Sequence, residues 1–452
     1  MMPLALILRA RGHEVAGSDR SRDQGLFQDK FAYLEDQGLS LFPQDGSGVS
    51  RPSQIYVDSG AVERDRIPDA AKATNLCWRM LRRPALLAEL FNTAEQPIGV
   101  AGTSGKSTTT AMIGWILSDC GKAPTVVNGA VMKNFAKPGA HFTSSIIGDG
   151  PAFVSELDES DGSIDLYSAD IAVLNNIAPD HKTLDELRKH FNGFVDRARA
   201  AVLNLDNEET AAIARRLGDK ATTWSLSNDE ADLSAADIVP GEWSISFDVS
   251  VRSTGERLPV NLGVPGRYNV ANALAALAAV QLAGVPLKDA AASLARFSGT
   301  KRRFEKVGEA RGVTVIDDFA HNPDKIAAML RALKEFPGRL LVVFQPQGFG
   351  PIRQFRDEFT ESFRDGLSDE DILYLTPPAN FGGTVDTSFS SPDLAKMVAT
   401  TGRNVFAPDN RDAAKDMLQR EAKPGDRIVV MGARDDSLTA FAASIVEALQ
   451  AR

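Results

Sequence analysis

The sequence predicts an α/β fold that is built on mostly parallel sheets. Short runs of β-branched residues alternate with helix-like patterns along the whole chain, which is typical of strand–helix–strand units. A buried-strand pattern at residues 98–101 leads directly into a glycine-rich loop and a helix at 107–117. Strict alternation of apolar and polar residues at 243–251, followed by a return strand at 258–262, indicates a small antiparallel addition.

Composition and charge narrow the class of protein. A chain of 452 residues predicts two to four domains at roughly 100–200 residues each, and 43% hydrophobic with 24% charged residues is ordinary for a globular protein. The 50 basic and 60 acidic residues give a net charge of −10, which argues against general nucleic-acid binding because such binding needs a basic face. A local basic pocket for a phosphate-bearing substrate remains compatible with this balance.

The cysteines and the apolar runs indicate where the protein works. Cys77 and Cys120 belong to no CxxC motif and no Cys/His cluster, so we expect neither a zinc site nor a disulfide framework. Two thiols in a chain of this length fit a reducing compartment. No apolar run approaches the roughly 18–20 residues that span a bilayer, and the start of the chain lacks the pattern of a secretory signal. We therefore expect a cytoplasmic protein with no membrane partner.

The first segment, residues 1–94, resembles a Rossmann-like unit without its first strand. A helix pattern at 3–11 precedes a strand pattern at 14–19, which ends in Gly-Ser-Asp as the second strand of such a unit does, and a further strand is expected at 54–57. The first strand and its glycine-rich turn are absent. Because that strand would lie in the middle of a parallel sheet, we expect a truncated sequence in which Met1 is an internal residue of a longer product. The alternative is that the ligand binding of such a unit is changed in this chain.

The second segment, residues 95–297, and the third, residues 298–452, each predict a sheet with helices. In the second segment a helix is expected at 268–283, and further strands at 153–157, 171–176, 201–205 and 221–226. Regular spacing in the third segment predicts a second doubly wound sheet before a last helix at 437–450. Its strands are expected at 313–316, 340–344, 372–375, 405–407 and 428–431.

The strongest chemical signal is a glycine-rich loop between a strand and a helix, formed by Gly102, Thr103, Ser104, Gly105, Lys106 and Ser107. Backbone N–H groups at such a helix start point toward anions, and the helix dipole adds to the attraction. Lys106 supplies a positive charge, and the Ser107 hydroxyl can bind Mg²⁺. The spacing is shorter than the strict Walker A pattern, since Val100 lies five positions before Gly105. The alternative, a chance glycine-rich turn, is disfavoured by the strand–loop–helix context.

Three further polar groups follow predicted strands or an adjoining loop. Glu156 ends a strand, where carboxylates face the ligand crevice of an open α/β sheet, and is a candidate Mg²⁺ ligand; the alternative is a solvated acidic turn. His181 follows another strand of the same sheet and could bind a second divalent cation, whereas a lone histidine is more often structural. Arg302 suits a γ-phosphate because its planar fork neutralises developing charge; the alternative is a solvated interdomain face.

These motifs occur together in an order that resembles the Mur ligase family, most closely its branch of UDP-N-acetylmuramate–L-alanine ligases and muropeptide ligases. The resemblance covers nearly all of the chain, and its motifs are together highly specific. They are GTxGK[ST]T at 102–108, E-x-DES from Glu156, N-x-x-x-DH at 176–181, G-R-x-N-x-x-N-A at 266–273, RRFE at 302–305 and DD-x-x-H-x-P at 317–323.

The resemblance implies a three-domain architecture and a set of residue roles. Residues 1–94 would bind the UDP substrate, 95–297 would form the central P-loop ATPase domain, and 298–452 would form a C-terminal Rossmann-like domain that receives the amino acid. ATP and Mg²⁺ are the implied cofactors. By this resemblance, residues 102–107, Thr108 and Arg302 would contact the ATP phosphates, with Lys106 at the β- and γ-phosphates. Ser107, Glu156 and His181 would bind Mg²⁺. Asn269 and Asn272 would lie by the adenine, and Asp317 would contact the ribose.

The implied activity is the formation of an amide bond. ATP would phosphorylate the carboxylate of a UDP-N-acetylmuramate-type nucleotide sugar to an acyl phosphate, and the amine of an amino acid or peptide would then displace phosphate. Lys106, Arg302 and two cations would offset charge on the transferring phosphoryl group. Because Arg302 and the loop belong to different domains, the resemblance also implies that domain closure gates the chemistry.

Departures from the family pattern leave the amine acceptor open. The alanine-adding enzymes place a His-Arg pair after Phe-Gln-Pro, whereas this chain has Gln347 and Gly348 there, with Arg353 nearby. Tyr268 stands where the G-x-HN run usually has histidine. One alternative is another member of the superfamily, such as a folylpolyglutamate or cyanophycin synthetase-like ligase, against which the DES and RRFE runs argue. The other is a nucleotide-binding scaffold that has lost UDP-sugar recognition, against which the intact Lys106, Glu156 and His181 argue.

Overall fold

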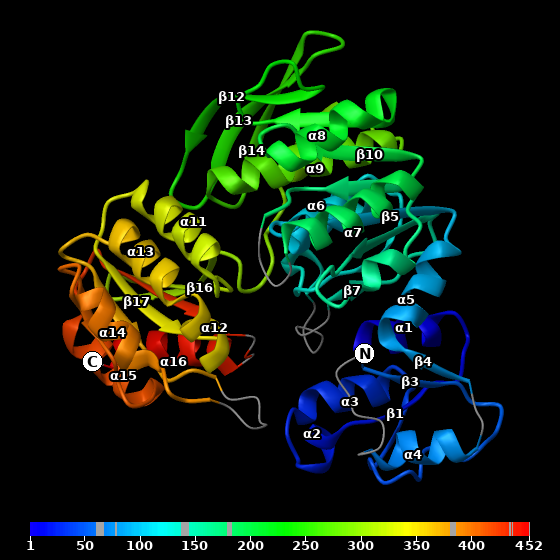
Figure 1. The fold of residues 1–452 in the computed structure, drawn as a ribbon, viewed down its shortest axis with the longest axis horizontal. Helices are drawn as coiled ribbons and strands as arrows, with labels where there is room; N and C mark the ends of the chain where they lie inside the picture. The colour runs from blue at the N-terminus through cyan, green and yellow to red at the C-terminus, as the bar shows by residue number, and fades with distance from the viewer. Residues whose placement is uncertain are drawn as a thin grey trace. The chain divides into compact units, whose positions relative to one another are not determined.

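The computed structural model describes residues 1–59, 67–76, 79–136, 144–178, 183–379, 386–433, 435 and 437–451. Over these residues the chain is a mixed α/β protein with mostly parallel sheets, which confirms the predicted fold class (Figure 1). It divides into two compact units. Unit 1 comprises Met1–Val239, Ile245–Gly263 and Asn269–Gly299, and unit 2 comprises Pro240–Ser244, Val264–Tyr268 and Thr300–Arg452.

The start of unit 1 contains two small parallel sheets. Strand β1 (Ala16–Ser18) pairs with β2 (Ser40–Phe42), and β3 (Tyr56–Asp58) pairs with β4 (Met80–Arg82). No strand among the described residues joins the two sheets. The accompanying helices are α1 (Met2–Ala10), α2 (Arg20–Asp23), α3 (Gln28–Asp36), α4 (Pro68–Asn75) and α5 (Arg83–Asn92).

A ten-stranded sheet forms the main body of unit 1, in the order β14-β13-β12-β11-β10-β9-β5-β8-β6-β7. The seven strands β12-β11-β10-β9-β5-β8-β6, which are neighbours in this order, run parallel. The pairs β13–β14 and β6–β7 are antiparallel. The strands are β5 (Gln96–Ala101), β6 (Thr125–Val127), β7 (Ser145–Ile146), β8 (Ala152–Glu156), β9 (Ile171–Leu174), β10 (Ala200–Asn204), β11 (Ala221–Ser225), β12 (Leu233–Pro240), β13 (Ile245–Val251) and β14 (Glu256–Leu262). Every second residue of β13 is buried, so the predicted antiparallel strand is confirmed.

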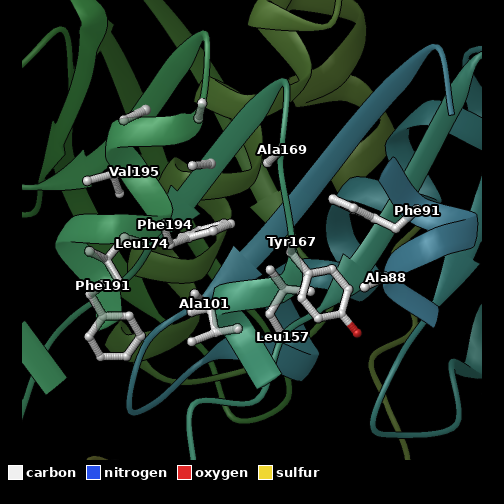
Figure 2. Close-up of a cluster of buried hydrophobic side chains, with 14 of the residues drawn as sticks. Ala88, Phe91, Ala101, Leu157, Tyr167, Ala169, Leu174, Phe191, Phe194 and Val195 are labelled. Carbon is white, nitrogen blue, oxygen red and sulfur yellow. The ribbon is translucent and has the colours of Figure 1, made fainter. Parts of the chain in front are cut away.

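The helices of this part are α6 (Lys106–Asp119), α7 (Leu184–Arg197), α8 (Glu208–Leu217), α9 (Arg267–Leu282) and α10 (Leu287–Leu294), with short 3₁₀ turns η2 (Lys133–Phe135), η3 (Ser163–Leu166) and η4 (Gly218–Lys220). One face of the sheet packs against α5, α7 and α8 in a single apolar cluster (Figure 2). Phe91 of α5 makes edge contacts with Phe153 (5.8 Å between ring centroids) and Tyr167 (5.4 Å). Helices α6 and α9 contribute nothing to that cluster, yet most of their residues are buried, which places them against the other face.

Unit 2 holds a six-stranded sheet in the order β15-β16-β20-β17-β18-β19. Its strands are β15 (Glu305–Ala310), β16 (Val313–Asp318), β17 (Leu340–Gln345), β18 (Ile372–Leu375), β19 (Asn404–Phe406) and β20 (Arg427–Gly432), all parallel except β15. Its helices are α11 (Pro323–Lys334), α12 (Phe349–Gln354), α13 (Arg356–Gly366), α14 (Ser391–Ala399), α15 (Arg411–Glu421) and α16 (Ser437–Ala451). Helices α11, α13 and α14 share one apolar cluster with the sheet, and α15 and α16 share another, as in a doubly wound fold.

The predicted strands of unit 2 lie within two residues of the observed ones, but β15 was not predicted. In unit 1 the strands β2, β4, β6, β7 and β12 were not predicted either. Strand β15 is an edge strand with a register shift between Lys306 and Gly308, and its alternation is broken there. Among the described residues no helix is both long enough and apolar enough to cross a membrane.

Gly99 in β5 gives a test of this packing. A Cβ added at Gly99 would lie 2.9 Å from Leu157 Cδ1 and 2.9 Å from Phe194 Cζ, both in the cluster of Figure 2. We expect Gly99→Ala to lower the free energy of unfolding of unit 1 by about 1–3 kcal/mol, because overpacking forces side chains off their rotamers. Gly350→Ala is the control, since nothing lies within 4 Å of its added Cβ. Equal urea midpoints for the two variants would contradict this packing.

Candidate functional site

Three neighbouring parallel strands bring the predicted site residues of unit 1 together. Strand β5 lies between β8 and β9, with Val100 beside Glu156 and Ala101 beside Leu174. The carboxyl ends of parallel strands meet at one edge of the sheet, which is where ligands bind in open α/β folds. The glycine loop after β5, the acidic turn after β8 and the asparagine run after β9 therefore form one site.

The loop after β5 has the backbone that only glycine adopts readily. Gly102 has φ +128° and Gly105, the N-cap of α6, has φ +84°. A Cβ at Gly102 would lie 3.0 Å from the carbonyl oxygen of Asn176, and one at Gly105 would collide with the side chain of Asn272. The two glycines thus let the loop fold tightly against its neighbours at the start of α6, where backbone N–H groups attract anions.

Asn176 holds the middle of the loop in place. Its Oδ1 accepts a hydrogen bond from the Ser104 N–H (2.9 Å), and its Nδ2 donates to the Ser104 carbonyl (3.2 Å). The Thr103 N–H donates to the Asn176 carbonyl (3.1 Å), and the Thr103 hydroxyl bonds to both the carbonyl and the N–H of Ala178 (3.0 Å each). The asparagine run thereby shapes the loop.

A buried chain of side-chain hydrogen bonds supports the loop from beneath. Asn175 Nδ2 donates to the Thr109 hydroxyl (2.9 Å), which donates to Asn272 Oδ1 (3.2 Å), and Asn272 Nδ2 donates to Asn269 Oδ1 (3.2 Å). The structure therefore brings both predicted adenine contacts, Asn269 and Asn272, to the loop. Thr109 and Asn175 were not assigned a role from the sequence.

Lys106 already has a partner within the protein. Its Nζ donates to the Gly102 carbonyl (2.7 Å) and lies 2.9 and 3.1 Å from the two carboxylate oxygens of Glu159. From the sequence, Glu156 was the predicted functional residue of the acidic run, and Glu159 was not predicted. Glu159 belongs to the DES run, so the motif included it. The alternation of residues along the preceding strand does not predict which acid of the following turn contacts Lys106.

Glu156 and Ser107, two of the predicted magnesium ligands, each accept a hydrogen bond from the segment after β6. Glu156 Oε2 accepts from the Gly129 N–H (2.8 Å), and Asn128 Nδ2 donates to the Ser107 carbonyl (3.1 Å). The described residues contain no cluster of three or more His, Cys, Asp or Glu that could hold a metal. Mg²⁺ usually takes only one or two protein carboxylates besides phosphate and water oxygens, so a single glutamate and a hydroxyl fit it. The predicted ligand His181 lies outside the described residues.

In unit 2, Arg302 and Asp317 form one buried cluster. Arg302 Nε lies 3.3 Å from Asp317 Oδ1, and Nη1 donates to the carbonyl oxygens of Ala433 (3.1 Å) and Asp435 (3.2 Å). Burial raises the pKa of Asp317, and the Arg302 guanidinium opposes that rise. Arg302 Nη2 is buried without a hydrogen-bond partner among the described residues. The guanidinium is thus fixed in orientation but keeps unused donor capacity.

A cavity of about 530 Å³ opens at the carboxyl edge of the unit 2 sheet. It is lined by Gln345, Pro377, Pro378, Ala379, Asp409, Asn410, Arg411 and Asp435. Arg411 Nη2 donates to Gln345 Oε1 and Asp435 Oδ2, and Nη1 donates to the Ser437 hydroxyl (2.6 Å). Arg353 instead pairs with Asp386 on the surface.

Comparison with known proteins identifies the family. The Mur ligase family, catalytic domain, matches residues 1–95; the Mur ligase middle domain matches 100–280; and the Mur ligase, glutamate ligase domain, matches 302–434. The UDP-N-acetylmuramate–L-alanine ligase of Rhizobium johnstonii is 32% identical over 465 residues, which covers 100% of this chain and 94% of the relative. The chain belongs to the Mur ligase family.

Further relatives of this Mur ligase share its length and fold. The UDP-N-acetylmuramate–L-alanine ligase of Cereibacter sphaeroides is 33% identical and covers 96% of the chain and 91% of the relative. The crystal structure of the UDP-N-acetylmuramate-alanine ligase from Thermotoga maritima has a TM-score of 0.80 at 24% identity, covering 100% of this chain and 96% of that one. A murein peptide ligase from Psychrobacter arcticus has a TM-score of 0.69 at 25% identity, with the same coverage.

Thr109 tests the support beneath the loop of this Mur ligase. Thr109→Val keeps the shape of the side chain but leaves Asn175 and Asn272 without their shared hydroxyl. We expect the variant to lose about 1–3 kcal/mol of unfolding free energy, since buried polar groups are left unsatisfied, and to bind ATP more weakly. Thr109→Ser retains the hydroxyl and should behave like the wild type. Calorimetric titration with ATP and thermal unfolding measure both effects, and a Val variant that matches the Ser variant would refute the role.

Proposed function

We propose that this chain is an ATP-dependent ligase that joins the carboxylate of a UDP-N-acetylmuramate-type nucleotide sugar to the amine of an amino acid or peptide. The observation that carries the proposal is the loop at the start of α6, with Lys106 and two glutamates at the same sheet edge. The relatives' names supply the substrate class. The proposed place of action is the cytoplasm, which two cysteines in 452 residues fit.

The reaction proceeds in two balanced steps. A carboxylate oxygen of the nucleotide sugar attacks the γ-phosphorus of ATP, ADP leaves, and an acyl phosphate forms. The neutral amine then attacks the acyl carbon, the tetrahedral intermediate expels phosphate, and the amine proton passes to a base or to water. Lys106 and the N–H groups at the start of α6 stabilise negative charge on the transferring phosphoryl group. Ser107 and Glu156 would hold Mg²⁺, which would supply further positive charge at the same phosphates.

The remaining roles follow the family and are part of the proposal. Residues 1–94 bind the UDP portion, residues 95–297 bind ATP, and residues 298–452 bind the amine. Asn269 and Asn272 lie by the adenine, and His181 binds a second cation. Arg302 contributes to the γ-phosphate and Asp317 to the ribose. Nη2 of Arg302 is buried and has no hydrogen-bond partner among the described residues, so its donor capacity is not used by the protein.

The cavity of unit 2 is the proposed acceptor site. The family's His-Arg pair after Phe-Gln-Pro is absent here, and Arg411 places a guanidinium beside Gln345 of that same run. A guanidinium binds a carboxylate through two parallel hydrogen bonds, which a zwitterionic acceptor requires. The carboxylate of Asp435, on the other side of Arg411, offers a partner for an ammonium group.

The assay that tests the function measures release of phosphate. The protein is incubated with ATP, Mg²⁺ and UDP-N-acetylmuramate while the amine is varied among single amino acids and short peptides. Phosphate release that depends on both the nucleotide sugar and an amine supports the ligase. Release with a pteridine or a dipeptide primer but not with the muramate supports another superfamily ligase, and no release with any amine supports a nucleotide-binding scaffold.

Lys106 is the residue on which turnover should depend most strongly. We expect Lys106→Ala to lower kcat by about two to three orders of magnitude, because a charged donor to the phosphoryl group is lost, while circular dichroism shows the fold intact. Lys122→Ala, an exposed lysine beyond the end of α6, serves as the control for loss of one positive charge. If Lys106→Ala retains wild-type kcat, the phosphate site has been misplaced.

Arg411 should govern the affinity for the amine. Arg411→Lys keeps the charge but loses the two-pronged geometry, so we expect the KM for the amine to rise at least about tenfold, while the KM for ATP stays within about twofold. Arg353→Lys is the matched control, because Arg353 of α12 is also an arginine of unit 2 but is paired on the surface with Asp386. Steady-state kinetics distinguish the two, and an amine KM that responds to Arg353 alone would place the acceptor elsewhere.

A further inference from the structure

Glu159 is held at Lys106 by the local fold of its turn. The Glu159 carbonyl accepts a hydrogen bond from the Gly162 N–H (3.2 Å), and Asp158 Oδ1 accepts from the Ser160 N–H (2.9 Å). Asp161 Oδ1 accepts from the Ser163 N–H (2.9 Å), which completes a second small turn. The carboxylate of Glu159 is therefore presented by an ordered turn rather than by a free surface chain.

The ion pair is sheltered from water. The side chain of Lys106 is 16% exposed and that of Glu159 is 9% exposed, which distinguishes this pair from the exposed ion pairs of the helices. Both carboxylate oxygens lie within 3.1 Å of Nζ. Screening by water is weak at such a position, so the pair holds the lysine more firmly than a surface pair would.

The same donors are the ones that a phosphate needs. An anion at the start of α6 would bind the Lys106 ammonium and the loop N–H groups. In the structure Glu159 occupies the ammonium, and Asn176 Oδ1 occupies the Ser104 N–H. The Glu159 carboxylate thus already satisfies the ammonium that the proposed function assigns to the nucleotide.

We propose that Glu159 is an internal competitor of the nucleotide: its carboxylate occupies Lys106 until a β- or γ-phosphate oxygen replaces it. The inference rests on the proposed ATP site. Lys106 keeps its hydrogen bond to the Gly102 carbonyl during this exchange, because that carbonyl lies on the loop itself. Glu159 acts through Lys106 and is a positioning residue, which sets how tightly phosphates bind.

The exchange lowers the apparent affinity for nucleotide. A ligand that binds only the fraction of molecules with a free Lys106 has its dissociation constant raised by the inverse of that fraction. Removing the negative charge of Glu159 removes this factor. We expect Glu159→Gln to tighten the binding of ATP and of ADP by about five- to tenfold, and to leave AMP unchanged, because AMP has no β-phosphate to meet Lys106.

Isothermal titration calorimetry on the full chain measures the dissociation constants of ATP, ADP and AMP. The titrations contain Mg²⁺ but neither the nucleotide sugar nor the amine. Asp158→Asn removes the same charge from the same turn and controls for a general field effect; its ATP affinity should stay within about twofold of wild type. The decisive comparison is a double-mutant cycle with Lys106→Met. In the Lys106→Met background, Glu159→Gln should not change ATP affinity, because there is no longer an ammonium group for which Glu159 and the phosphate compete.

The outcomes separate the inference from the proposed function. If wild-type protein binds no ATP, both fail. If wild-type protein binds ATP but Glu159→Gln binds it no more tightly, or if the tightening persists in the Lys106→Met background, the competitor role alone is overturned. Should Glu159→Gln not fold, a crystal structure of the wild type with a non-hydrolysable ATP analogue decides: Lys106 Nζ must leave Glu159 for a phosphate oxygen, and a retained 2.9 Å contact refutes the exchange.

Discussion

The site of unit 1 depends on the meeting of three parallel strand ends, β8, β5 and β9, at one edge of the sheet. Each strand end carries a different kind of group: an acid after β8, a glycine loop after β5 and amides after β9. The amides matter because a loop that closes this tightly buries backbone donors and acceptors that water cannot reach. Asn176 satisfies both the N–H and the carbonyl of Ser104, so the loop is already in one conformation when a ligand arrives.

In unit 2 the central feature is a buried arginine, Arg302, whose orientation is fixed by its backbone and its neighbours. Arg302 and Phe304 both have positive φ, at +57° and +48°, although neither is a glycine. Asp318 accepts hydrogen bonds from the N–H groups of Phe304 and Ala320 (2.7 Å each), which holds that backbone in place. Burial raises the pKa of Asp318, and Arg303 opposes the rise. Strain that is held by buried charges is typical of a functional segment, which fits the role proposed for Arg302.

The sequence predicted the elements better than it predicted the contacts between them. Alternation in β13 and the apolar runs of β17 and β18 each reflect a local burial pattern, so those strands could be predicted from their own residues. The glycine loop was recognisable because strand, loop and helix are contiguous. The link from Thr109 to Asn272 spans 163 positions and depends on the packing of α9 against α6, which no local pattern contains. The Arg411–Gln345 contact depends in the same way on strand order, since β17 and β19 are separated in the sheet by β18.

The competition between Glu159 and a phosphate for Lys106 is a consequence of a loop that is already ordered before the nucleotide binds. A sheltered ammonium without an anion is costly, because burial disfavours the charged form. A carboxylate partner removes that cost and keeps the lysine aimed at the loop, but it also opposes the ligand. A nucleotide phosphate can displace Glu159 from Lys106 because it carries more negative charge than one carboxylate. It also reaches the N–H groups at the start of α6, which Glu159 does not contact in the described residues. Single carboxylates lack that advantage, so the pairing favours polyphosphates over the weaker anions that any ammonium attracts.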